Sequence, residues 1–522
     1  MAKVASQSTE ANRDFATKPE RLSRRALSER LFRAITFSCV GFAIAILAII
    51  LISILSVSVR AFTHHQLSVP LEPALDRLLG SGASGVDDLA NSLPGFNALV
   101  IDGVEAALEP QANRTNHRSA FEGFFAPLAV SDIAQTISDN PSLLGVRRQY
   151  SVPLSSGLDQ YLKGQITDET LISISAETLS TMLDGRTTLA LNSLPDIVIG
   201  ALEGAATERP SVFLETGEGV YKVEPVDAGN AQLSLLIDSP EFLNARGRFR
   251  VVWRPESQRA VSDLDIALAR VLKQKGVIKS RLNTRLFRAA DSTYPELAGT
   301  LAALVGSLLT LLVTASVSVP IGVMAAIWLE EFAPRNRFTD FVEVNINNLA
   351  AVPSIVFGLL GAAVLLNLFG LPRSAPLVGG LVLALMTLPT VIIASRAALS
   401  AVPQDLRTAA LSLGASPMQV VADHVLPAAA PGILTGVILG LARSLGETAP
   451  LLLIGMVVFI GEVPTSLGDD ATTLPVLIYK WSTGAERAWE PLTAAAIVIL
   501  LFVMVCINVL VSYLRQRFER KW

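Results

Sequence analysis

The stretch "LRTAALSLGASPMQVVADHVLPAAAPGI", residues 406–433, places a polar segment between two long apolar runs. Gly414 divides this segment into two pieces that each have the composition of a short helix. Pro427 closes the second piece, and we expect this proline to end it before the next membrane span begins. The pattern predicts an amphipathic surface loop that joins two membrane helices.

The composition of the whole chain is that of a membrane protein. Its 522 residues are 51% hydrophobic and 17% charged, and its mean hydropathy is +0.48. Ordinary soluble chains of this length are less apolar. The net charge of −4 indicates no surface for nucleic acid, and four scattered histidines predict neither a metal site nor a cofactor.

Six apolar runs are long enough to cross a membrane whose hydrocarbon core is about 30 Å thick. The first run follows five arginines and lacks the short apolar core and cleavage site of a signal peptide, which favours a retained helix. The runs cover residues 34–59, 297–329, 344–371, 374–395, 428–460 and 491–513. The sequence predicts an all-α polytopic membrane protein with six transmembrane helices surrounded by lipid.

A mixed and moderately acidic segment, residues 60–296, separates the first two apolar runs. Its stretch "VSDIAQTISDNPSLLG" has a helical period, whereas "GVYKVEPVD", "AQLSLLID" and "RFRVVWR" alternate as strands do. The segment is long enough for one globular domain. We therefore predict an inserted α+β domain, called the inserted domain below.

The basic residues of the short loops indicate how the chain is oriented. Lys and Arg concentrate on the cytoplasmic side of membrane proteins. With six spans, the following residues fall on one side together with the amino terminus: Arg335, Arg337, Arg396, Arg407, Arg515, Arg517, Arg520 and Lys521. We expect both termini to be cytoplasmic and the inserted domain to be periplasmic.

The polar loop at 406–427 resembles the EAA loop of ABC importer permeases. That pattern is Glu-Ala-Ala, three residues, Gly, nine residues, Ile, one residue, Leu-Pro, and the spacing is kept here. Its matching residues are Ala409, Ala410, Gly414, Leu426 and Pro427. Thr408 stands where the pattern has Glu, and His424 stands where it has Ile. The resemblance implies that this loop docks on a cytoplasmic ATPase subunit.

Four further segments narrow the resemblance to the PstA family, the permease subunits of phosphate importers. They are "IGVMAAIWLEEF" (321–332), "VPSIVFGLLG" (352–361), "ARSLGETAPLLL" (442–453) and "LPVLIYKW" (474–481). The resemblance covers residues 297–522. The inserted domain is outside the common pattern of that family and resembles an extra amino-terminal region found in a subset of it.

The resemblance implies an ABC type I importer permease in a bacterial inner membrane. The expected divisions are a tail (1–33), a first helix (34–59), the inserted domain (60–296), a permease domain (297–513) and a tail (514–522). Such a subunit works with a PstC-like homologous permease, a dimeric PstB-like ATPase and an external PstS-like protein that binds inorganic phosphate. A permease for another oxyanion, sulfate or molybdate, shares the EAA loop and stays open as an alternative.

The chain has no Gly-x4-Gly-Lys-Ser/Thr loop and no Gly-Lys dipeptide, so nothing in it can cradle nucleotide phosphates. We therefore expect a transport subunit that is not an enzyme, with ATP hydrolysed by a separate chain. A phosphate-responsive membrane sensor or scaffold that works through its inserted domain is the alternative from a different class.

Two charges lie inside an apolar span, and these are the candidate substrate-pathway residues. Counted at about 1.5 Å per residue from Pro431, which we expect near the cytoplasmic boundary, Arg443 falls near the membrane midplane and Glu447 one turn further out. They can form an i, i+4 ion pair, line a path for an oxyanion, or pair with a companion subunit. Ser444 and Thr448 could add hydroxyls to such a path.

Four prolines in the apolar runs predict bends around a central path. They are Pro320, Pro353, Pro389 and Pro450. Proline removes a backbone donor and its ring crowds the preceding turn, so it kinks or breaks a helix.

Overall fold

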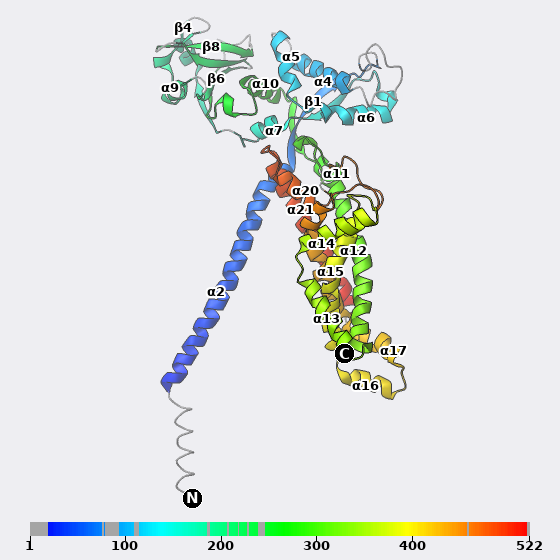
Figure 1. Ribbon diagram of the computed structural model, residues 1–522. Helices are drawn as coiled ribbons and strands as arrows, with labels where there is room; N and C mark the ends of the chain where they lie inside the picture. Colours follow the sequence, from blue (N-terminus) through cyan, green and yellow to red (C-terminus); the bar gives the residue numbers. More distant parts are fainter. Residues whose placement is uncertain are drawn as a thin grey trace.

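The computed structural model describes residues 19–75, 78, 93–108, 114–166, 168–184, 188–205, 208–217, 219–226, 229–237, 246–456 and 459–518. A bundle of long helices carries an α+β domain at one end, and a separate long helix leads into that domain (Figure 1). Residues 1–18 of the predicted amino-terminal tail and residues 519–522 of the carboxy-terminal tail, including Arg520 and Lys521, lie outside the described residues.

The membrane-type helices are few and long. Five helices among the described residues are long and apolar enough to cross a membrane. A sixth span results only if the helices at Arg337–Ala350 and Ser354–Leu368, which are bent by 99° relative to each other, are counted as one. The helices outside the inserted domain, spanning and short together, are α2 (Pro19–Ser58), α12 (Leu301–Ile327) with η8 (Trp328–Phe332), α13 (Arg337–Ala350), α14 (Ser354–Gly361) with η9 (Ala362–Leu368), α15 (Pro376–Ser400), α16 (Gln404–Ser412), α17 (Pro417–Gln419) with η10 (Val420–Val425), α18 (Leu426–Gly446), α19 (Ala449–Leu453), α20 (Leu474–Ser482) and α21 (Trp489–Phe518). The count of six therefore stays a prediction.

Pro427 does not end the second piece of the polar loop, which corrects the sequence prediction. Residues Pro417 to Gly446 form one helical unit, and Pro427 lies in the first turn of α18. The preceding segment η10 is a π-helix. A wider π turn moves the preceding carbonyls away from the proline ring, so the helix continues instead of stopping.

The prediction of a single helix over residues 428–460 is also wrong. α18 ends at Gly446, Glu447 has an extended backbone, and the short α19 begins at Ala449. Pro450 in the first turn of α19 cannot donate a hydrogen bond back to the end of α18. Gly455, with φ +94°, then turns the chain away.

Small residues bring α15 and α18 into close contact. Gly432, Gly436 and Gly440 follow one another at four-residue intervals on α18. A methyl group added at Gly436 would lie 2.2 Å from Cβ of Ala394 on α15, which is closer than any real contact. Side chains this small let helix backbones approach closely inside a membrane. The two helices therefore form a firmly packed pair.

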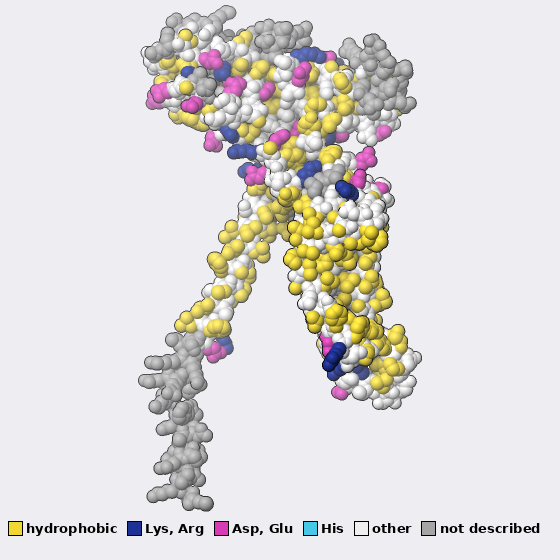
Figure 2. Space-filling view, in the orientation of Figure 1, with side chains coloured by type: hydrophobic (Ala, Val, Ile, Leu, Met, Phe, Trp, Pro, Cys, Tyr) yellow, Lys and Arg dark blue, Asp and Glu magenta, His cyan; other side chains and the backbone are white. Residues whose placement is uncertain are grey.

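α2 leaves the bundle at an angle (Figure 1). Its apolar window is wholly exposed, and the yellow hydrophobic surface in Figure 2 covers both this helix and the bundle. Charged side chains gather instead on the inserted domain and at the far end of the bundle in that view. This distribution is the one expected for helices whose long apolar faces contact lipid.

The inserted domain contains two antiparallel sheets. The smaller sheet has the order β10-β1-β2 and the larger has the order β3-β9-β6-β7-β8-β5-β4. The strands are β1 (Thr63–Leu71), β2 (Arg148–Pro153), β3 (Glu169–Ile174), β4 (Leu183–Asp184), β5 (Thr188–Ala190), β6 (Ser211–Thr216), β7 (Gly219–Pro225), β8 (Asn230–Ile237), β9 (Gly247–Val252) and β10 (Ile278–Leu282). β7, β8 and β9 confirm the three strands expected from alternation.

Helices cover both sheets. They are α4 (Leu93–Leu108), α5 (Arg114–Glu122), α6 (Ser131–Asp139), α7 (Ser156–Leu162), α8 (Ala176–Met182), α9 (Asp196–Leu202) and α10 (Asp263–Gln274). The short helix α11 (Arg285–Arg288) instead packs on the bundle through Leu286. One core joins the smaller sheet to α4, α6 and α10, and a second lies between the larger sheet and the pair α8 and α9. α6 confirms the helix expected from its period, and the α+β class of the inserted domain is confirmed.

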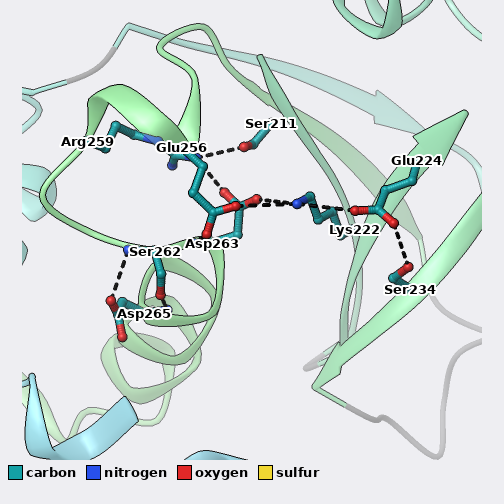
Figure 3. Close-up of polar contacts among 9 residues, drawn as sticks. All are labelled: Ser211, Lys222, Glu224, Ser234, Glu256, Arg259, Ser262, Asp263 and Asp265. Carbon is teal, nitrogen blue, oxygen red and sulfur yellow. Dashed lines mark hydrogen bonds and ion pairs between the residues drawn. The ribbon is translucent and has the colours of Figure 1, made fainter. Parts of the chain in front are cut away.

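An ion-pair network fixes α10 to the larger sheet (Figure 3). Lys222 on β7 lies 2.9 Å from Asp263 at the start of α10, and Arg259 lies 2.5 Å from the same carboxylate. Burial acts to lower the pKa of Lys222, but its hydrogen bond to Asp263 and the negative charge there raise the pKa overall. Glu224 and Glu256 also approach Lys222. Because the positive and negative side chains pair with one another across α10 and the larger sheet, we interpret this network as a structural brace.

Polar contacts seat the inserted domain on the bundle. Ser156 donates to Glu486, which lies between α20 and α21, over 2.9 Å. Trp481 on α20 donates to Asp291 over 3.1 Å, and Lys480 pairs with the same carboxylate. A small cavity at this junction is lined from both sides. His64 on β1 and Glu296 before α12 line it, and each has one buried polar atom without a hydrogen-bond partner among the described residues.

The pKa values of His64 and Glu296 at this cavity are shifted in opposite directions. Burial lowers the pKa of His64 from 6.5 to about 4, against the attraction of Asp159. Burial also raises the pKa of Glu296 from 4.5 to about 7, and the charges of Glu486 and Asp159 add to that rise. The contribution of neutral His64 to the free energy of unfolding is complete above pH 6.5 and is lost as the pH falls to about 4. The contribution of protonated Glu296 to the free energy of unfolding is complete below pH 4.5 and is lost as the pH rises to about 7.

We expect Glu296→Gln to raise the melting temperature of the purified chain above pH 7 and to leave it unchanged below pH 4.5. The amide removes the cost of ionising a buried carboxyl but keeps its shape. Thermal unfolding across this pH range measures the difference. Glu203→Gln, at an exposed glutamate of the same domain, is the control and should give no pH-dependent difference. A gain from Glu296→Gln that does not change with pH would refute the assignment.

Candidate functional site

α18 has two different faces. Its buried residues include Gly436, Gly440 and Ser444, which face α15. Leu439 and Arg443 are exposed beside this contact. α18 therefore packs on α15 through these small residues and leaves the side chain of Arg443 exposed beside the contact.

Arg443 and Glu447 meet at the broken end of α18. Their Nε and Oε1 atoms are 3.6 Å apart, and the arginine side chain is 54% exposed whereas the glutamate is 20% exposed. Glu447 caps the helix with extended backbone angles, so the two do not share one continuous helix turn as the sequence predicted. The distance makes this an ion pair without a close hydrogen bond, which leaves the guanidinium donors open to another acceptor.

The two neighbouring hydroxyls lie in different surroundings. Ser444 is 1% exposed, donates to the Gly440 carbonyl over 3.0 Å, and shares a hydrogen bond with Thr387 on α15. Its hydroxyl is used in helix packing, as is common for serine in membrane helices. Thr448 lies beside Glu447 at the start of α19, and its side chain makes no capping hydrogen bond. Thr448 is thus the more available of the two.

The four prolines divide into two kinds. Pro320 and Pro389 lie inside α12 and α15, which run through them without a break. Pro353 lies at the 99° turn between α13 and α14. Pro450 lies just after the break between α18 and α19. The sharp changes of direction are thus near Pro353 and Pro450.

The polar loop forms two helical pieces at the end of the bundle away from the inserted domain (Figure 1). Gly414 between them has φ +91°, a backbone conformation that side chains disfavour. Ser416 and Gln419 form a capping box that starts the second piece. Leu413 is 90% exposed and Met418 is 66% exposed, so the loop presents an apolar tip to its surroundings.

The candidate residues of this loop occupy distinct positions. Ala409 is exposed on α16, whereas Ala410 is buried against the bundle. Leu426 and Pro427 are half-buried where the loop enters α18. Thr408, at the position of the missing Glu, is exposed and donates to backbone carbonyls of its own helix.

Two family models match the chain. Residues 318–520 match "Binding-protein-dependent transport system inner membrane component", and residues 19–171 match a "Domain of unknown function (DUF3333)". A phosphate transport system permease protein PstA from Haemophilus influenzae is 33% identical over 241 residues, which cover 46% of this chain and 83% of that protein. The chain belongs to the PstA family of phosphate transport system permeases.

A second PstA relative agrees with this membership. PstA 1 of Mycobacterium tuberculosis is 34% identical over 220 residues, which cover 41% of this chain and 69% of that protein. Among solved structures, an inward-facing MetNI methionine ABC transporter aligns with 42% of this chain and 95% of its own at 18% identity. Its TM-score of 0.33 is too low to establish a shared fold.

Sequence reasoning missed two features of this PstA-family chain. Thr387 holds Ser444 against α15, and Arg407 pairs with Glu331 beside the polar loop. Neither partner is near the other in sequence, so no local pattern signals the contact. Among the described residues, no group of three or more His, Cys, Asp or Glu is arranged to hold a metal ion.

Proposed function

We propose that this chain is one of the two permease subunits of an ATP-driven phosphate importer in a bacterial inner membrane. In this proposal both termini and the polar loop are cytoplasmic, and the inserted domain is periplasmic. The second permease is a PstC-like homologue, a PstB-like dimer supplies ATP hydrolysis, and a PstS-like protein delivers phosphate from outside. The chain itself catalyses no covalent reaction.

The exposed Arg443 is the observation that carries this proposal. A charged side chain at the membrane centre costs on the order of 3 kcal/mol when it has no partner. Glu447 offsets only part of that cost, because the pair is 3.6 Å apart and the arginine is 54% exposed. Such a residue needs water or a polar partner rather than lipid on its open side. A path between two permease subunits supplies both.

The chemistry of the guanidinium fits a tetrahedral oxyanion. Arginine presents a planar fork of donors that matches phosphate oxygens and always carries its charge. Glu447 competes for the same donors, so phosphate would be bound weakly enough to leave. Thr448 adds a hydroxyl at the same level. The names of the two PstA relatives support phosphate over sulfate or molybdate.

The polar loop fits the role of a coupling element. Its tip carries Leu413 and Met418, which are too exposed and too apolar for a simple connector. Gly414 lets the two helical pieces meet at an angle. In the proposal, closure of the ATPase moves this loop and changes which side of the membrane the path opens to.

Co-purification tests the proposal against a sensor that works without an ATPase. We expect the tagged chain to bring down an ATPase from its own cells, and we expect Leu413→Asp to weaken that association about tenfold or more, since a central interface residue contributes roughly 2 kcal/mol. Leu282→Asp, at a leucine 72% exposed on the inserted domain, is the matched control and should retain the ATPase. Recovery of the intact chain without any ATPase would favour the sensor.

A further inference from the structure

Two arginines and three glutamates form two groups of ion pairs at the loop end of the bundle, which meet at the adjacent residues Glu330 and Glu331 and are together called the network below. They are Glu330, Glu331, Glu343, Arg396 and Arg407. Glu330 and Glu331 lie in η8, the π-helical end of α12, and Glu343 lies on α13. Arg396 is on α15 and Arg407 is on α16. The network therefore connects four helices, one of which belongs to the polar loop.

Arg407 makes the most hydrogen bonds in this network. Its Nη2 lies 2.7 Å from Oε1 of Glu331, and its Nε lies 3.2 Å from the second carboxylate oxygen. The two side chains are only 13% and 10% exposed. A forked pair of this kind fixes orientation as well as distance, because both nitrogens must face both oxygens.

The same guanidinium also holds the end of α15. It donates to the carbonyls of Leu399 and Val402 over 2.9 and 2.6 Å. These carbonyls belong to the last turn of α15 and the residues just after it. The end of a helix carries partial negative charge, so a cation there is favourable. One side chain of α16 thus binds both α12 and α15.

Arg396 extends the network to α13. Its Nη2 lies 2.7 Å from Glu343, and its Nε lies 3.5 Å from Glu330. α12, α13 and α15 are therefore tied together beside the point where Arg407 joins α16. A displacement of α16 therefore acts on α12, α13 and α15 together rather than on a single helix.

We propose that Arg407 and Glu331 are positioning residues that transmit movement of the polar loop to α12 and α15. This inference rests on the proposed function. α15 packs tightly on α18 through Ala394 and Gly436, and α18 carries Arg443. A continuous series of packed contacts therefore runs from α16 to the face of the candidate path. Loss of the pair leaves the ATPase docking surface in place, because Leu413 and Met418 lie outside the network.

A purely stabilising pair would behave differently from a transmitting pair. Removing one partner of a partly buried ion pair destabilises a protein whatever its role. Transmission additionally changes how much phosphate moves for each ATP hydrolysed. That ratio is independent of how many complexes survive purification, so it separates the two roles.

The experiment compares variants in the complete transporter, co-expressed with its companion subunits and reconstituted into vesicles. Phosphate uptake and ATP hydrolysis are measured in the same preparation. We expect Arg407→Ala to lower the phosphate moved per ATP at least about fivefold, the lower end of typical coupling between sites. Because the pair acts as a unit, Arg407→Ala combined with Glu331→Ala should be no worse than either single change.

Arg335→Ala is the matched control, since Arg335 is an exposed arginine at the same end of the bundle. It should leave the ratio unchanged. If the Arg407→Ala transporter does not assemble, the ratio is measured with Arg407→Lys instead. Lysine keeps the positive charge but cannot form the paired hydrogen bonds of arginine. An unchanged ratio in the assembled Arg407 variant, or additive losses in the double variant, overturns the transmission role. Absence of uptake by the unmodified transporter would instead overturn the proposed function.

Discussion

Arg443→Ala should reduce phosphate uptake by about a hundredfold or more, the loss seen when a preorganised contact to an oxyanion is removed. The substitution takes away the only charged donor exposed on the described part of α18. Glu447→Ala should also abolish uptake, because phosphate would then be held without a competing carboxylate. Uptake of labelled phosphate by cells that lack the native chain measures both effects.

Leu439→Ala is the control for these variants. Leu439 is 64% exposed and lies one helical turn before Arg443 on the same face of α18. Its truncation should leave uptake close to normal. The amount of each variant in purified membranes shows whether the complex has assembled. Normal uptake with Arg443→Ala would refute a pathway role, and loss of the whole complex would make the ion pair structural.

Gly436→Leu should unfold or rearrange the bundle. A methyl group alone at this position would lie 2.2 Å from Cβ of Ala394, and a leucine requires α15 and α18 to separate. Overpacking of this kind costs about 1–3 kcal/mol and occasionally more. The melting temperature of the purified chain in detergent and its yield from membranes measure the effect.

Gly41→Leu is the comparison for this change. Gly41 lies in α2, and an added Cβ meets nothing within 4 Å. The same increase in side-chain volume should therefore be tolerated. Equal destabilisation by the two substitutions would mean that the loss does not come from the contact between α15 and α18.

Much of the architecture could be predicted from composition and period. Long uncharged runs located α2, α12, α15 and α21, because lipid accepts only helices that satisfy their own backbone. Alternation located β7, β8 and β9 in the inserted domain. These signals are local. Each depends on the pattern of apolar residues within one helix or strand and not on the elements that pack against it.

The helix ends were less predictable. Pro427 was expected to stop a helix, yet a π-helical segment before it lets the chain continue. Glu447 was expected inside a helix, yet α18 ends there. A proline pattern shows where hydrogen bonding is weakened, but the surrounding helices decide whether the chain bends, widens or breaks.

The candidate site was predicted in part. Arg443 stood out because a charge in an apolar run is costly wherever it lies. The different settings of Ser444 and Thr448 depend on α15, which sequence alone does not bring near. Arg407 and Glu331 are 76 residues apart in the chain, so their pairing required the fold.

Competition for uptake tests the central proposal most directly. The complete transporter is placed in vesicles with ATP and binding protein, and labelled phosphate uptake is measured with an excess of unlabelled phosphate, sulfate or molybdate. We predict ATP-dependent uptake that unlabelled phosphate suppresses and that sulfate and molybdate leave unchanged. Suppression by sulfate or molybdate, or the absence of ATP-dependent phosphate uptake, would contradict the assignment of this chain to phosphate import.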